Sequence, residues 1–246
     1  MNLFDMLIRR SRPQEQSDSS SSSGGVTPVL PTDYVRRYEL TANLKDSKHS
    51  TNTDYDLTKP SYASVSYGTE DGITGCKVTG SCLYNTWTTG LSTTNGFCMS
   101  LWAKCAASPA SSANPNCLAN ISQYWTSNSW YIGYRNGCWC GGTAKSSTAQ
   151  IIQSTTAVDT SWHCIALNWN KSDAQVELWL DGVLQGVITG VSSLTITNKG
   201  VTVNAGEASH GASPDGKPDV NVRYRDITVF ARSLSEAEIL GLAQEH

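Results

Sequence analysis

Residues 161–184 read SWHCIALNWNKSDAQVELWLDGVL. Two runs in this segment, 162–169 and 176–180, are rich in aromatic and aliphatic side chains, which suit the pleated surface of a β-strand. The dipeptide Asp-Gly at 181–182 follows the second run and is a strong signal for a two-residue hairpin turn. A third strand is therefore predicted over 183–187, and the whole segment predicts neighbouring antiparallel strands.

The sequence on both sides of this segment continues the same pattern. Asn136-Gly137 marks a second two-residue hairpin turn, and Ser235 with Glu238 forms a capping box that predicts a short C-terminal helix. Further strands are predicted over residues 97–103, 129–135, 138–140, 148–154, 194–197, 201–204 and 220–230. Many short strands with turn signals between them indicate an antiparallel sandwich of two sheets.

Three segments carry a family resemblance: FCMSLWAK at 97–104, the hairpin region at 161–184, and VRYRDITVFARSLSEAEI at 222–239. In this order and spacing they resemble the laminin-G-like, concanavalin-like lectin and glucanase domains. The resemblance implies an all-β fold, an antiparallel two-sheet jelly roll that ends in a short helix. This fold hosts lectins, adhesins, hydrolase appendages and structural modules, so it does not fix a function.

Composition limits the classes of partner. The chain has 246 residues with a net charge of −3, and charged residues make up 16%. Because there is no basic excess to neutralise phosphates, we expect no nucleic-acid partner. No apolar run approaches the roughly 18 residues of a spanning helix, so we expect no membrane span.

The sequence predicts three parts. Residues 1–12 are interpreted as a docking peptide, residues 13–33 as a tether rich in Ser, Gly and Pro, and residues 34–246 as the sandwich. The first two parts together form an extended N-terminal arm, because a Ser/Gly-rich run cannot bury enough apolar surface to offset its ordering entropy.

The docking peptide is interpreted from its apolar side chains. Charged residues interrupt and follow these side chains, which is unlike a secretory signal. One alternative is a frayed terminus; the other is that a partner covers the apolar side chains, which are costly to leave exposed. The residues predicted to dock are Leu3, Phe4, Leu7 and Ile8.

Eight cysteines are many for an intracellular protein. Cys138 and Cys140 stand two apart on a predicted strand, which places both sulfurs on one face in poor geometry for a mutual bridge. Zinc sites typically show paired CxxC elements, and the sequence has none. Reduced thiols are expected, with bridges if the protein later meets an oxidising exterior.

Familiar catalytic patterns are missing. Glycoside hydrolysis needs two carboxylates across the scissile bond, and the concanavalin-like glucanases resemble E-x-D-x-x-E at that place. Here Glu177 and Asp181 stand four apart, and the hairpin turn takes Asp181. None of the four histidines lies near a nucleophile motif. We therefore expect a protein that is not an enzyme.

No cofactor is expected, although the resemblance raises calcium as a ligand. Calcium requires six to eight hard oxygen ligands. The candidate metal ligands are Asp54 and Asp56 in an early loop, and Asp215 with Asp219 in a later one. The alternative is that these aspartates form turns by capping their own backbone.

Sugar recognition requires aromatic faces for the pyranose ring and polar groups for its hydroxyls. The residues that supply this mixture are Trp125, Trp130, Tyr131, Tyr134 and Asn136. The alternative for the tryptophans is burial in the core, which is common for this residue type.

These observations favour a structural virion protein of a bacteriophage, a decoration or fibre-like subunit. Its N-terminal arm would dock on capsid or tail proteins in many copies. The sandwich would then be displayed on the particle surface, where it can bind host-surface polysaccharide. The alternatives are a carbohydrate-binding adhesion module at a cell surface and a glycan-degrading enzyme.

Overall fold

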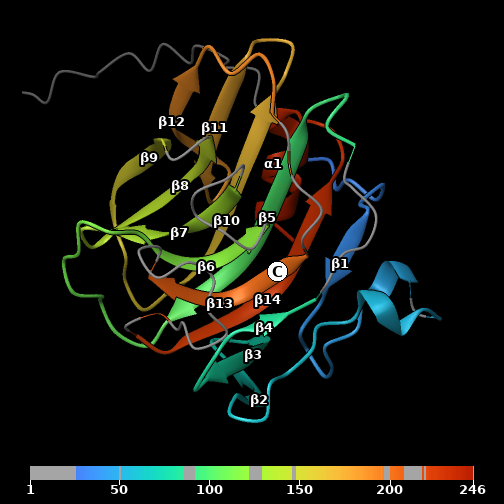
Figure 1. Cartoon of the computed structure of the whole chain (residues 1–246), viewed down its shortest axis with the longest axis vertical. Coiled ribbons are helices and arrows are strands. Elements are labelled where there is room, and N and C mark those ends of the chain that lie inside the picture. Colours follow the sequence, from blue (N-terminus) through green and yellow to red (C-terminus); the bar gives the residue numbers. More distant parts are fainter. Residues whose placement is uncertain are drawn as a thin grey trace, which may run out of the picture.

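The computed structural model describes residues 26–49, 51–85, 92–121, 129–145, 148–194, 196, 200–207, 218 and 220–245. These residues fold into two antiparallel sheets that pack face to face, with one α-helix near the C-terminus (Figure 1). The predicted all-β sandwich of two antiparallel sheets with a short closing helix is confirmed.

The larger sheet has eight strands and is called sheet A. β1 pairs with β14 beside the main path of the sheet. In spatial order the other strands are β12 (Val183–Thr189), β11 (Gln175–Leu180), β10 (Trp162–Asn170), β5 (Phe97–Cys105), β14 (Val222–Phe230), β3 (Ile73–Thr79) and β2 (Ser64–Glu70), and β1 is Arg36–Tyr38.

The smaller sheet has six strands and is called sheet B. In spatial order its strands are β4 (Leu83–Tyr84), β13 (Val201–Glu207), β6 (Asn116–Ile121), β7 (Ser129–Arg135), β8 (Cys138–Lys145) and β9 (Thr148–Ala157). Two short 3-10 helices, η1 (Ser47–His49) and η2 (Thr53–Tyr55), precede β2, and α1 (Glu236–Ala243) follows β14.

The predicted hairpin turns set the register of both sheets. Asn136 and Gly137 have φ angles of 50° and 74°, and Asp181 and Gly182 have φ angles of 51° and 79°. Two successive left-handed residues match the twist of antiparallel strands, so Arg135 pairs with Cys138 and Leu180 with Val183. A strand is predicted over residues 194–197, but Leu194 and Ile196 lie in no strand. Both side chains are buried in the core instead.

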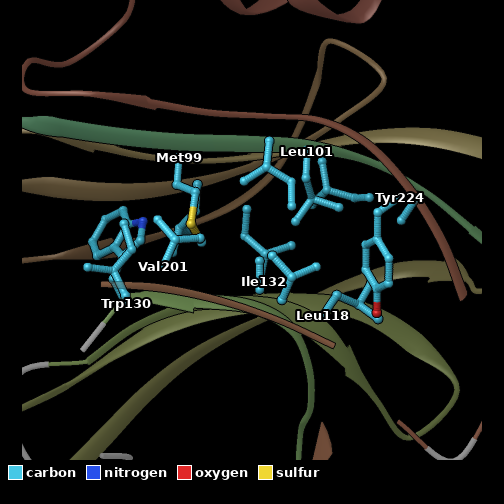
Figure 2. Close-up of a cluster of buried hydrophobic side chains, with 14 of the residues drawn as sticks. Met99, Leu101, Leu118, Trp130, Ile132, Val201 and Tyr224 are labelled. Atoms are coloured by element: carbon cyan, nitrogen blue, oxygen red, sulfur yellow. The ribbon is translucent and has the colours of Figure 1, made fainter. Parts of the chain in front are cut away.

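The main core lies between the two sheets. Figure 2 shows side chains of the two layers meeting in this space. Sheet A contributes Met99, Leu101 and Tyr224, and sheet B contributes Leu118, Trp130, Ile132 and Val201. At roughly 25 cal/mol per Å² of buried apolar surface, this layer is the main source of stability.

A second apolar cluster lies on the other face of sheet A, where α1 covers β5 and β10 (Figure 1). Ile239 and Leu242 of the helix pack there with Trp102 and Trp179. Trp102 Nε1 donates to the carbonyl oxygen of Leu242 at 3.3 Å. Because both faces of β5 and β10 are buried, these strands are apolar almost continuously instead of alternating.

The predicted capping box begins α1. The Ser235 hydroxyl accepts from the backbone N–H of Glu238 at 3.4 Å, and the Glu238 carboxylate accepts from the backbone N–H of Ser235 at 2.9 Å. In the described part of the chain, no helix is long and apolar enough to cross a membrane.

A buried polar network fixes the segment before α1 to sheet A. Asn168 Nδ2 donates to Glu177 Oε2 at 2.9 Å and to the Leu234 carbonyl at 3.1 Å, while Asn168 Oδ1 accepts from the Leu234 N–H at 2.9 Å. Trp179 Nε1 donates to Glu177 Oε2 at 3.1 Å. Glu177 is only 9% exposed. These bonds satisfy its carboxylate, which would be costly to bury without partners.

Residues 26–33, which the sequence assigns to the tether, lie against the sandwich. The Val29 N–H donates to the Ala237 carbonyl at 2.9 Å, and Pro31 is buried. Asp33 binds Arg232 through two hydrogen bonds of 2.6 and 2.7 Å. Residues 26–33 therefore belong structurally with the sandwich.

The eight cysteines, all of them among the described residues, form no disulfide, and Cys138 alone among them is more than slightly exposed. Burial raises the pKa of the Cys76 and Cys117 thiols to about 12. A thiol with such a pKa stays protonated near neutral pH and is a poor nucleophile. The cysteines act here as small buried apolar side chains.

We expect Asn168→Asp to destabilise the fold by about 3 kcal/mol near neutral pH, because a carboxylate oxygen would replace the amide that donates to Glu177. Urea unfolding of the full chain measures this difference. Asn43→Asp makes the same chemical change at an exposed position and should cost less than about 0.5 kcal/mol. Equal losses in the two variants would contradict the role of the network.

Candidate functional site

Two of the predicted sugar-binding rings point into the core. Trp130 is completely buried between the sheets (Figure 2), with its ring 5.4 Å from that of Phe97 in an edge-to-face contact. Tyr134 is 1% exposed and belongs to the same cluster. Neither ring offers a face to a ligand, so the prediction that they contact sugar is wrong and the alternative of burial holds.

The other predicted sugar contacts do not form a site together. Tyr131 lies in a separate small cluster with Cys117 and Cys140, is completely buried, and has the pKa of its hydroxyl raised by this burial. Asn136 is exposed at the tip of its hairpin, where its positive φ serves the turn. Trp125 lies outside the described residues.

The candidate calcium ligands make turn contacts. The Asp54 N–H donates to Asn52 Oδ1 at 3.0 Å in a cap of η2, and Asp56 Oδ1 accepts from the Asp46 N–H at 2.9 Å. Across the described residues, no group of three or more His, Cys, Asp or Glu side chains is arranged to hold a metal ion. Asp215 and Asp219 lie outside the described residues.

His163 on β10 lies between two carboxylates. Its Nδ1 is 2.6 Å from Asp181 Oδ2, and its Nε2 is 3.0 Å from Asp159 Oδ1. Burial lowers the pKa of His163, but the hydrogen bonds and charges of Asp181 and Asp159 outweigh it and leave the pKa raised. Both ring nitrogens are therefore engaged in hydrogen bonds. The ring links the β11–β12 turn to the start of β10, and it is not free to accept a proton from a nucleophile.

A small hollow, open to solvent, lies on the outer face of sheet A. It forms where β2, β3, β14 and β5 run side by side, beyond the part of the sheet that α1 covers. Its lining is mainly charged and polar: Glu70, Lys77, Lys104, Ala106, Asn221, Val222 and Arg223.

Three cations form a row across this hollow, called here the cationic row: Lys77, Arg223 and Lys104. Arg223 pairs with Lys77 on one side and with Lys104 on the other in the antiparallel register. Directly opposite residues of neighbouring strands share a face with their Cβ atoms about 5 Å apart. The row is thus a consequence of the register of three strands that are distant in the chain.

The β2–β3 turn supplies carboxylates to two of these cations. Arg223 Nε donates to Glu70 Oε1 at 2.5 Å, and Lys104 forms an ion pair with Asp71. The Arg223 and Lys104 side chains are 19% and 14% exposed, so both charges are largely withdrawn from water. Among the described residues, Lys77 has no hydrogen-bond or ion-pair partner.

Two glycines make room for the large side chains of this region. A Cβ at Gly75 would lie 2.7 Å from the indole of Trp162, and a Cβ at Gly68 would lie 3.5 Å from Arg223 Nη1. Trp162 Nε1 donates to the Glu70 carbonyl at 3.0 Å, and this tryptophan pairs with Lys104 across β10 and β5. The Trp162 indole, which is 9% exposed, therefore supports the β2–β3 hairpin beside the hollow without lining it.

The chain matches a known protein family over most of the sandwich. Residues 79–240 match the family described as the concanavalin A-like lectin/glucanases superfamily. The chain belongs to this family. No curated protein sequence matches the chain at a significant level.

Solved structures share the fold at low sequence identity. Domain 4 of AbnA, an extracellular arabinanase from Geobacillus stearothermophilus in complex with arabinotriose, is 14% identical with a TM-score of 0.64 and covers 86% of this chain and 98% of its own. The binding domain of botulinum neurotoxin DC in complex with rat synaptotagmin II is also 14% identical, with a TM-score of 0.60 over 86% of this chain and 51% of its own.

The ligand-binding domain of botulinum neurotoxin serotype D, in complex with N-acetylneuraminic acid, is 15% identical with a TM-score of 0.60 over 86% of this chain and 50% of its own. The chain thus spans about half the length of these toxin domains. These likenesses establish the concanavalin-like fold predicted from the sequence.

The raised pKa of His163 predicts a pH-dependent contribution to stability. A group whose pKa is higher in the folded than in the unfolded state stabilises the fold below the unfolded value, about 6.5 for histidine, and loses this contribution as pH rises through the folded value. We expect His163→Gln to cost up to about 1 kcal/mol near pH 5 and much less near pH 9. Thermal unfolding of both proteins at the two pH values measures this; an equal cost at both would contradict it.

Proposed function

We propose that this protein is a carbohydrate-binding module that does not act as an enzyme. The observation that carries the proposal is the hollow on the outer face of sheet A, lined mainly by charged and polar residues, in a domain of the lectin and glucanase family. Sugar sites combine hydrogen-bonding side chains, which fix orientation, with apolar or aromatic surface. The hollow supplies guanidinium, ammonium, carboxylate and amide groups beside the apolar side chains of Ala106 and Val222.

Two structural neighbours support this proposal through their bound ligands. The arabinanase domain is in complex with arabinotriose, and the serotype D toxin domain with N-acetylneuraminic acid. The match spans nearly all of the arabinanase domain and half of the toxin domain, so the arabinanase domain gives the stronger support. The arabinanase domain also has nearly the length of the matched region, so a sandwich of this size is a complete unit there.

The electrostatics of the described residues favour binding over hydrolysis. Glycoside hydrolysis uses a pair of carboxyl groups that flank the scissile bond. Glu70 and Asp71, the acidic residues nearest the hollow, are each engaged in an ion pair instead, with Arg223 and with Lys104.

We further propose that the protein is a decoration or fibre-like subunit of a bacteriophage virion, present in many copies on the particle surface. The support is the composition of the N-terminal arm, in which apolar residues precede a Ser/Gly-rich run. A weak peptide contact repeated over a symmetric lattice gains strength by avidity. An adhesion module on a cell surface would use the same sandwich but would not need capsid or tail proteins as partners.

Binding to a panel of bacterial surface polysaccharides tests the first proposal. The full chain should bind at least one glycan class, and Arg223→Gln should weaken that binding about tenfold or more, because charge-assisted hydrogen bonds are among the stronger polar contacts. Arg135→Gln is the matched control, since Arg135 also makes a hydrogen bond from a strand of the sandwich. A full chain that binds no glycan of the panel would contradict the proposal.

Deletion of residues 1–12 tests the virion proposal. Incorporation into phage particles should be lost while the melting temperature of the sandwich stays unchanged, because the apolar residues Leu3, Phe4, Leu7 and Ile8 are removed and the described core is not. Co-sedimentation with purified particles measures this. A deleted protein that still co-sediments as the full chain does would show that the sandwich itself is the anchor.

A further inference from the structure

We infer that the hollow binds the negatively charged group of an acidic sugar, a carboxylate or a sulfate, between Lys77 and Arg223. This inference rests on the proposed carbohydrate binding and names the class of sugar. Three independent features of the described residues support it: the like-charged register, the incomplete neutralisation of the row, and the shape of the hollow.

The register places like charges directly opposite each other twice. Lys77 is opposite Arg223, and Arg223 is opposite Lys104. Such pairs are destabilising in a sheet, and a protein surface normally avoids them or alternates the signs. A row of three cations on a half-buried face is therefore an arrangement that an anion would stabilise.

The protein's own carboxylates neutralise this row at one end. Glu70 binds Arg223 and Asp71 binds Lys104, whereas Lys77 has neither a carboxylate nor a hydrogen-bond partner among the described residues. Arg223 Nη1 is buried and has no hydrogen-bond partner in this part of the structure. A buried N–H without a partner is costly, so the guanidinium would gain a hydrogen bond by turning toward a ligand oxygen.

The shape of the hollow favours a single charged group on a sugar over a polyanion such as nucleic acid. A small hollow with one basic row offers few contacts to a long phosphate backbone. The chain as a whole carries a net charge of −3, so its field does not attract polyanions in general. The exposed amide of Asn221 lies beside the row and suits the hydroxyls of a sugar ring.

The test compares acidic oligosaccharides with neutral counterparts of the same sugar. The full chain is titrated with oligogalacturonate and its methyl ester, and with a sulfated oligosaccharide and its desulfated form, at low and high salt. The acidic member of at least one pair should bind about tenfold more tightly or better, and this preference should shrink with added salt. The two pairs distinguish carboxylate from sulfate.

The variant Lys77→Gln should remove most of the preference for the acidic member while the neutral counterpart binds as before. Lys45→Gln is the matched control, because this substitution removes the same charge from an exposed lysine away from the hollow. Circular dichroism and melting temperature check that both variants fold.

Each outcome is informative about a different proposal. Equal binding of acidic and neutral sugars by the full chain, or an unchanged preference in Lys77→Gln, would overturn this inference and leave carbohydrate binding intact. A full chain that binds none of the sugars, acidic or neutral, would overturn the proposed function and this inference together.

Discussion

The burial of the central strands of sheet A on both faces governs the rest of this structure. Sheet B and the main core cover one face, and α1 covers the other over β5 and β10. Covering both faces of a strand requires apolar side chains at nearly every position, which the sequences of these two strands supply. It also confines any site on this outer face to the part of the sheet that α1 leaves open, and the hollow lies there.

The helix is short, so its position depends on what fixes it to the sheet. Eight residues of helix are marginal alone in water. The Asn168–Glu177 network holds the segment before the helix, the capping box starts it, and residues 26–33 lie along it. The start of the described chain and its closing helix are therefore one structural unit.

The sequence predicts the fold well because its strongest signals are local. Asn136-Gly137 and Asp181-Gly182 specify hairpins through backbone conformations that few other dipeptides adopt, and Ser235 with Glu238 specifies a helix start. Aromatic side chains gave no such guidance for the site. Alternation along β7 shows that Trp130 and Tyr134 share a face, but only packing decides whether that face is the core or the surface. The cationic row carries no local signal at all, because Lys77, Lys104 and Arg223 meet through pairings between strands far apart in the chain.

The turn between β2 and β3 links this charge distribution to the architecture. Asp71 and Gly72 adopt φ angles of 53° and 80°, so the turn is of the same two-residue kind as the predicted hairpins. It places Glu70 and Asp71 at one end of the cationic row, where they bind Arg223 and Lys104. At the other end, β2 offers Lys77 the exposed Ser66 as its cross-strand partner. A carboxylate at that position would have completed the neutralisation of the row within the sheet. The uncharged serine instead leaves the Lys77 end of the hollow positive and open to solvent, the end at which an anion from outside the protein would complete the row.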